Sequence, residues 1–185
     1  MITKIELKLK RFSEVMEKFP LIRYAGDPIL RSVASEASVE EGVEIGTKLG
    51  EMLVEYRKFA GMGRGLAAPQ IGLAKRVFVT YLDDQIQIYI NPQMTSTSKQ
   101  SNHYRELCLS SGLMWGDVVR STWVVLKWTD AAGREKEEKF EGVVARLIQH
   151  ELDHLQGVMN LDRAEPGSIE FALADPLKEV LRDSK

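Results

Sequence analysis

The pentapeptide HELDH, at residues 150–154, is the feature that most constrains what this chain can fold into. Residues 142–156 carry apolar side chains at a period of 3.6, which predicts an α-helix. On that helix His150 and His154 stand one turn apart and can hold one metal ion. Glu151 lies on the same side, within reach of a water molecule at the metal without being a ligand. We therefore expect a metal site on this helix.

The helical wheel also predicts which way the two histidines point. Val143 and Leu147 fall in their sector, so this side of the helix should face the protein interior. Gln149, Asp153 and Gln156 fall on the opposite arc, which is polar. Two buried histidines without a metal or an acidic partner would be costly, and this cost favours the metal interpretation.

The third protein ligand is open at this point. The extended metalloprotease pattern HExxHxxGxxH fails, because Asn160 stands where its last histidine would be. His103 lies in a polar stretch and should be at the surface, and Glu165 and Glu170 sit in no supporting pattern. Cys108 is the better candidate, because it is the sole cysteine, lies between two leucines, and offers a thiolate. The alternative for Cys108 is an inert core thiol.

The central part of the chain is dominated by predicted strands. Two strand pairs are expected, at residues 76–82 with 85–91 and at 122–128 with 134–140. The last of these segments, REKEEKF, has almost nothing to bury and should be a solvated edge strand.

Helices are predicted on both sides of these strands. Residues 43–59 have helical spacing, and the glycines that follow should end that helix. Residues 5–10 are interpreted as a short strand and 11–19 as a helical turn or two, and a last helix is expected from about Ser168. The order helix, strands, helix, helix indicates an α+β fold.

Length and composition exclude several classes. We expect the 185 residues to form one domain, with residues 1–20 as an extension of unknown role and 164–185 as a C-terminal helical segment. The formal net charge of −2 gives no overall attraction to nucleic acid or anionic membranes. The lone cysteine and the absence of an apolar leader or membrane span predict a cytoplasmic protein.

Three separated motifs resemble the peptide deformylase family and stand in the family's order. They are GRGLAAPQIG at residues 63–72, ELCLS at 106–110 and QHELDH at 149–154. Shorter echoes lie at residues 27–31, 91–92 and 154–157, so the resemblance spans about residues 21–163. It implies antiparallel β-sheets packed around the central HExxH helix.

The resemblance also implies an activity and a ligand set. The family hydrolyses the formyl group from the N-terminal formylmethionine of new polypeptides, in the cytoplasm and so near ribosomes, where a transient association is possible. Cys108, His150 and His154 would hold one divalent metal per chain, natively iron(II) in many members, with zinc, nickel or cobalt possible. Glu151 would take the proton of the attacking water and deliver it to the leaving amine.

Further residues take roles from the same resemblance. The Gln70 side-chain amide and the Leu109 backbone N–H would stabilise the oxyanion of the tetrahedral intermediate. Gly65 would let the substrate backbone lie close, as an added strand. Glu106 and Arg120 match positions that pair in the family, and such an ion pair would brace the cysteine loop.

The sequence departs from the family pattern on the substrate side. Leu107 stands where the family usually has glycine, and Arg64 stands where many members carry valine or isoleucine in the wall of the methionine pocket. Residues 111–117 differ from the usual Val-Pro-Gly, and Met114 and Trp115 are expected to supply new pocket surface. These departures leave two alternatives open: an amidohydrolase for another N-acyl peptide, or a non-catalytic protein that binds formylated N-termini. A conventional HExxH endopeptidase is the remaining enzyme alternative.

Overall fold

A computed structural model describes residues 4–171. Its helices are α1 (Lys4–Lys18), α2 (Val39–Ala60) and α3 (Gly142–Leu155). Its strands are β1 (Gly65–Ala67), β2 (Val77–Leu82), β3 (Gln85–Thr97), β4 (Ser101–Leu107), β5 (Met114–Ser121), β6 (Trp123–Thr129), β7 (Glu135–Glu141) and β8 (Glu170–Phe171). The described part of the chain therefore has the expected α+β composition.

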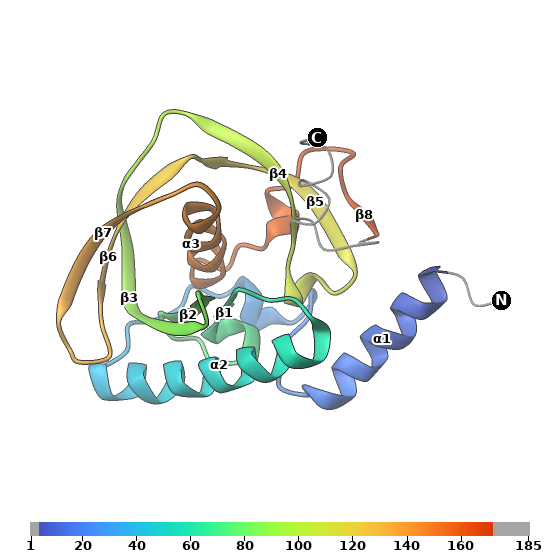
Figure 1. The fold of residues 1–185 in the computed structure, drawn as a ribbon, viewed down its shortest axis with the longest axis horizontal. Coiled ribbons are helices and arrows are strands. Elements are labelled where there is room, and N and C mark those ends of the chain that lie inside the picture. The colour runs from blue at the N-terminus through green and yellow to red at the C-terminus, as the bar shows by residue number, and fades with distance from the viewer. Residues whose placement is uncertain (1–3, 172–185) are drawn as a thin grey trace.

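All strand pairs within the two sheets are antiparallel. The larger sheet has the order β1-β2-β3-β6-β7, and the smaller has the order β4-β5-β8. Both predicted strand pairs are confirmed, and β7 is the charged edge strand that its sequence indicated. In Figure 1 the strands curve around α3, which lies near the centre of the fold.

Two helices cover opposite faces of the larger sheet. One buried apolar cluster joins α3 to β2, β3 and β6, and a second joins α2 to the other face of β2 and β3. On α2, Gly42, Gly46 and Gly50 follow one another at a spacing of four and face isoleucines of β3. A Cβ atom on Gly46 would lie 2.4 Å from Cγ2 of Ile88. The glycine stripe therefore lets α2 pack closely on the sheet.

The ends of the chain differ from expectation. Residues 5–10 belong to α1, so the predicted short strand there is wrong, and the helix runs through Lys18. Glu170 and Phe171 pair with β5 as β8, so no helix begins at Ser168. The rest of the predicted last helix lies outside the described residues. An alternating apolar pattern over a few residues fits a strand or one helical face equally well, which explains the first error.

Candidate metal centre and active site

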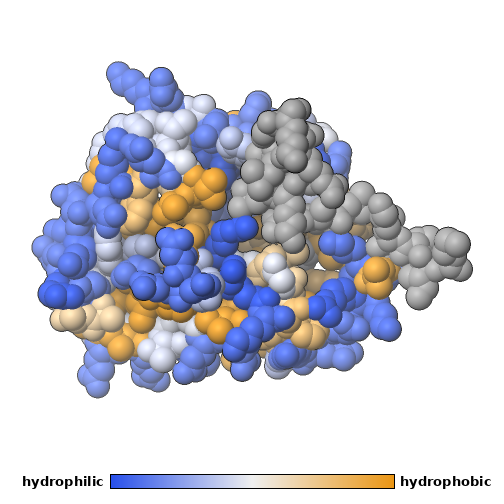
Figure 2. Space-filling model, in the orientation of Figure 1, coloured by the Kyte–Doolittle hydropathy of each residue, from blue (hydrophilic) through white to orange (hydrophobic). Residues whose placement is uncertain are grey.

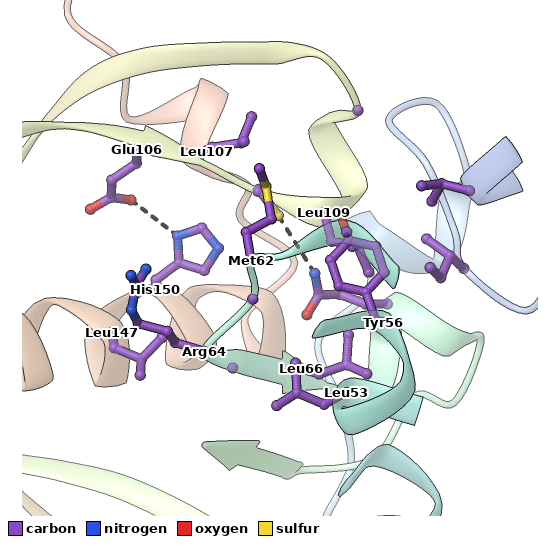
Figure 3. Close-up of a pocket in the computed structure, with 18 of the residues that line it drawn as sticks. Leu53, Tyr56, Met62, Arg64, Leu66, Glu106, Leu107, Leu109, Leu147 and His150 are labelled. Atoms are coloured by element: carbon purple, nitrogen blue, oxygen red, sulfur yellow. Dashed lines mark hydrogen bonds and ion pairs between the residues drawn. The ribbon is translucent and has the colours of Figure 1, made fainter. Parts of the chain in front are cut away.

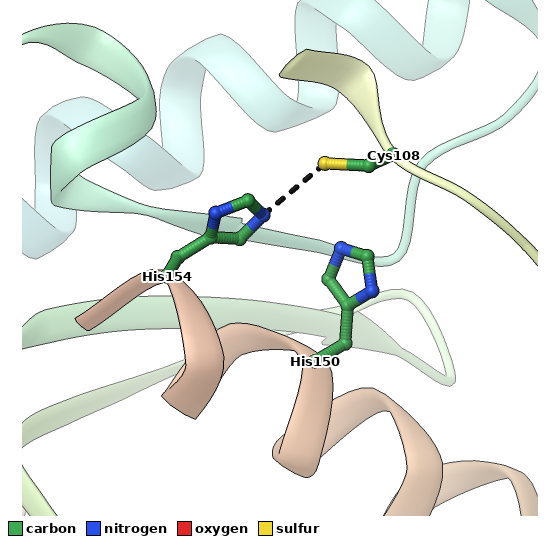
Figure 4. Close-up of side chains that lie close together, drawn as sticks. All are labelled: Cys108, His150 and His154. Atoms are coloured by element: carbon green, nitrogen blue, oxygen red, sulfur yellow. Dashed lines mark hydrogen bonds between the residues drawn. The ribbon is translucent and has the colours of Figure 1, made fainter. Parts of the chain in front are cut away.

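The two histidines and the cysteine meet in the structure. Cys108 follows β4, while His150 and His154 lie one turn apart on α3. Their potential ligand atoms all lie within 4.8 Å of one another, and His154 Nε2 is 3.1 Å from the Cys108 sulfur. Figure 4 shows both rings on the side of α3 that faces the cysteine. Among the described residues, this is the one cluster of three or more such side chains that could hold a metal.

The chemistry of these side chains fits a metal ion. Cys108 and His154 are almost fully buried, at 1% exposure each, so they meet with little water between them. Burial raises the pKa of the Cys108 thiol, but the charges of His154 and His150 outweigh this effect and hold that pKa well below its usual range. A buried thiolate beside two imidazoles is a donor set for iron, zinc, cobalt or nickel. Glu165 and Glu170 are not part of the cluster, and His103 is exposed as predicted.

Glu106 orients His150 from behind. The Nδ1 atom of His150 lies 3.0 Å from Oε2 of Glu106, which leaves Nε2 for a metal. Two arginines hold the same carboxylate: Arg120 binds it through Nε and Nη2 at 2.7 and 2.9 Å, and Arg146 through Nη1 at 2.5 Å. Burial opposes ionisation of Glu106, but the hydrogen bonds from His150 and Arg120 hold its pKa well below the usual range. The expected pairing of Glu106 with Arg120 is thus part of a larger buried network.

Asp153, on the polar arc of α3, extends this network. Its carboxylate accepts hydrogen bonds from Arg120 Nη1 at 2.8 Å and from Arg163 Nε and Nη2 at 2.5 and 2.7 Å. Only 7% of Asp153 is exposed, because β5 and the segment around Arg163 cover that side of α3. The helical wheel could not reveal Arg146, Asp153 and Arg163 as partners, because they meet only through the tertiary fold.

Glu151 lies between the two histidines in sequence and lines the same pocket. It is 2% exposed, and no described residue bonds its Oε2 atom. Desolvation by burial raises its pKa to about 7. A Cβ atom on Gly65 would lie 2.3 Å from Oε1 of Glu151, so only a glycine leaves room for this carboxylate. The sequence analysis explains this glycine by the close approach of the substrate backbone. The structure gives a second reason, which is the close approach of the Glu151 carboxylate.

Gln70 is fixed so that its amide nitrogen faces the cysteine. Its Oε1 atom accepts the Ala67 N–H at 2.8 Å, and its Nε2 atom lies 3.5 Å from the Cys108 sulfur and 3.3 Å from the Ser110 hydroxyl. The backbone N–H of Leu109 begins a 3-10 turn, where N–H groups have no acceptor within the turn. Both groups named in the sequence analysis therefore lie beside the metal cluster.

Cys108, His150, Glu151, Gln70 and Leu109 line one open pocket of about 640 Å³. Figure 3 shows His150 and Glu106 on one side of it and Leu109 and Tyr56 on the other. Arg64, Gly65 and Leu107 are all among the lining residues. Trp115 is not: it is 2% exposed, and Met114 is also absent from the lining. The predicted contribution of these two side chains is wrong. Gly112 and Leu113 line the pocket in their place.

The comparisons with known proteins agree with this site. The profile of the polypeptide deformylase family matches residues 20–169. A peptide deformylase of Pseudothermotoga lettingae is 40% identical over 165 residues, covering 89% of this chain and 93% of the relative. One of Treponema pallidum is 35% identical over 144 residues, covering 78% and 87%.

Solved structures show the same fold. The crystal structure of peptide deformylase from Thermotoga maritima superposes with a TM-score of 0.70 at 34% identity, covering 78% of this chain and 97% of that one. The enzyme from Synechococcus elongatus in complex with actinonin gives a TM-score of 0.68 at 34% identity, covering 79% of each chain.

Proposed function

This chain belongs to the peptide deformylase family, and we propose that it hydrolyses the N-formyl group of polypeptides that begin with formylmethionine. One observation carries the proposal: Cys108, His150 and His154 form one cluster, and Cys108 and His150 line a pocket together with Glu151 and Gln70. The cluster supplies the metal ligands, and the other two supply a proton carrier and a hydrogen-bond donor.

The proposed cofactor is one divalent metal per chain, with iron(II) as the native ion and zinc, nickel or cobalt as possible substitutes. Cys108, His150 and His154 would hold it. When bound, the metal would supply Lewis acidity and make water a stronger nucleophile at neutral pH. Glu106 would keep His150 in the orientation that leaves Nε2 available, through the hydrogen bond at Nδ1.

Residues of the chain would carry out the proton transfers and stabilise the developing negative charge. Glu151 would accept a proton from the attacking water and deliver it to the nitrogen of the departing peptide, so that one carboxylate serves both steps. The Gln70 amide and the Leu109 N–H would donate hydrogen bonds to the oxygen that becomes negative in the transition state. Because Ala67 already holds Gln70 Oε1, the amide does not need to reorganise as this charge develops.

The substrate side of the proposal concerns the pocket rim. Gly65 and Leu107 line the pocket on β1 and β4, and Arg64 lines it from the loop before β1. We propose that these three residues contact the N-terminal part of the peptide. Since the substrates are nascent chains, the proposed location is the cytoplasm, with transient association with ribosomes. No helix within residues 4–171 has the length and apolar character needed to cross a bilayer. We also propose that the whole chain forms one deformylase-like domain.

The test is formate release from formyl-Met-Ala by protein purified without oxygen and loaded separately with iron(II), nickel(II) or zinc(II). We expect release with at least one metal, and loss of both metal and release in the Cys108→Ala variant. Acetyl-Met-Ala is the matched control, and we expect it to remain intact. Equal hydrolysis of both peptides would indicate a broader N-acyl amidohydrolase. Metal binding without hydrolysis of either peptide would favour a binding protein.

A further inference from the structure

Helix α1 forms part of the wall of the active-site pocket, although it precedes the residues that match the family profile. Five of its side chains line the pocket together with the site residues; they are Leu7, Lys8, Arg11, Phe12 and Val15. Their spacing places them on one face of the helix. The N-terminal segment thus presents a continuous surface to the same cavity as Cys108 and Glu151.

The C-terminal half of α1 is anchored to the body of the protein beside the site. Val15 is buried with Phe19 and Ile22 in an apolar cluster, and Tyr56 and Leu109 pack against that cluster. Leu109 is the residue whose backbone N–H is proposed to bind the oxyanion. The position of α1 is therefore fixed relative to the chemistry.

Two further contacts hold the middle of α1 against the pocket wall. A Cβ atom on Gly112 would lie 3.0 Å from Cζ of Phe12, so the ring rests on the loop that follows Cys108. The same ring meets Tyr24 edge-on, with centroids 5.2 Å apart. Arg11 lies over the Phe59 ring at 4.2 Å and donates to the Phe59 carbonyl. The first turns of α1 then extend along the pocket opening, and apolar residues are visible between charged ones at the centre of this face (Figure 2).

Exposure shows which part of the substrate meets α1. Cys108 and Glu151 at the floor are 1% and 2% exposed, whereas Leu7 is 61% exposed. A formylated N-terminus must reach the floor to be hydrolysed. The residues that follow it must then leave through the opening, along the side chains that line the rim.

The rim is basic as well as apolar. Lys8 and Arg11 come from α1, and Arg64 comes from the loop before β1. Among the described lining residues, the acidic ones are Glu106 and Glu151, and both are buried at the floor. Arg11 is already paired with Glu14 at 3.3 Å, so Lys8 is the α1 cation at the rim that an acidic side chain in the exiting peptide would meet.

We propose that α1 is a specificity element of this enzyme: Leu7 and Lys8 contact the residues that follow the formylmethionine and favour peptides with acidic side chains there. This inference rests on the proposed function, since it takes the pocket to be the site of a formylated peptide.

The activity test uses three substrates: formyl-Met-Ala, formyl-Met-Ala-Asp-Asp and formyl-Met-Ala-Lys-Lys. The variants are Lys8→Glu with Lys10→Glu as its control, and Leu7→Ser with Leu9→Ser as its control. The control residues are exposed on the same helix and do not line the pocket. Lys8→Glu should lower the Asp-to-Lys ratio of kcat/KM about fivefold or more at low salt. Leu7→Ser should lower kcat/KM of both tetrapeptides about fivefold. Formyl-Met-Ala should be unaffected.

Peptide binding to the same variants in a Glu151→Gln background separates this inference from the proposed function. Changes in Kd that follow the pattern above support the role of α1 even if the wild-type chain releases no formate, and that result would remove only the proposed hydrolysis. Normal hydrolysis with equal effects of Lys8→Glu and Lys10→Glu would overturn the inference and leave the function intact. An effect of the α1 variants on formyl-Met-Ala would also overturn it, because α1 would then contact the first residue.

Discussion

Replacing Gly65 by alanine tests the position of the proposed proton carrier. The added Cβ atom would lie 2.3 Å from Oε1, 2.7 Å from Cδ and 3.0 Å from Cγ of Glu151. Non-bonded heavy atoms essentially never lie within 3.0 Å of a Cβ atom, so the Glu151 carboxylate must move away by roughly 1 Å. Displacement of that size in a catalytic group costs about 100-fold in rate, or about 2.7 kcal/mol of transition-state stabilisation. We therefore expect kcat/KM for formyl-Met-Ala to fall about 100-fold in Gly65→Ala.

The matched control is Gly46→Ala on α2. There the added Cβ would lie 2.4 Å from the Ile88 side chain, an equally close contact that does not involve the pocket. Overpacking of this kind costs about 1–3 kcal/mol of stability, partly offset by the better helix propensity of alanine. We expect thermal unfolding to change in this variant while kcat/KM stays close to that of the wild type.

The assay combines formate release, metal content and thermal unfolding for both variants. A folded Gly65→Ala protein with full metal content and a rate within threefold of the wild type would refute the placement of Glu151. Loss of metal in Gly65→Ala would also contradict the reasoning, because the added methyl group is expected to displace the carboxylate and not the ligands.

Three other predictions concern the same centre. Glu151→Gln should retain metal and lower kcat by at least about 100-fold, measured as formate release beside metal analysis. Glu106→Gln should weaken metal binding about 10- to 100-fold and destabilise the fold by about 3–5 kcal/mol, because Arg120 and Arg146 lose a buried charge partner. For Glu106→Gln the measurements are metal titration and urea unfolding, and the exposed Glu138→Gln is the control. Unchanged metal affinity would contradict the role assigned to Glu106. Removal of metal by a chelator should lower the Tm of the wild type and leave the Tm of Cys108→Ala unchanged, because only the wild type binds the ion. Equal shifts of Tm in both proteins would contradict the proposed ligand set.

The sequence predicted the floor of the site better than its surroundings. Cys108, His150 and His154 could be identified from the sequence, because metal chemistry restricts the residue types and the helix fixes the spacing of the two histidines. The roles of Gln70 and Leu109 came from resemblance, since nothing in local spacing places a glutamine amide near a thiol 38 residues away.

What the sequence could not predict depends on long-range packing. Asp153 could be assigned only to a polar arc, because the wheel shows which residues share a side and not what covers that side. The covering elements are β5 and the segment that carries Arg163. Residues 5–10 were assigned to a strand because the apolar positions alternate. In the fold these residues continue a helix whose C-terminal half is stabilised by burial of Val15 and Phe19.

The residues that depart from the family pattern lie nearer the pocket opening than the residues proposed to carry out hydrolysis. This separation allows substrate preference to change without loss of hydrolysis. Cys108 and His154, the proposed metal ligands, and Glu151, the proposed proton carrier, are 1–2% exposed. Arg64 and Leu107, where the sequence departs from the family pattern, are more accessible and line the opening. A side chain at the opening affects how a peptide enters, whereas the barrier to hydrolysis is set at the floor. Variation at the rim, including at α1, should therefore act on KM and on sequence preference more than on kcat for the shortest substrate.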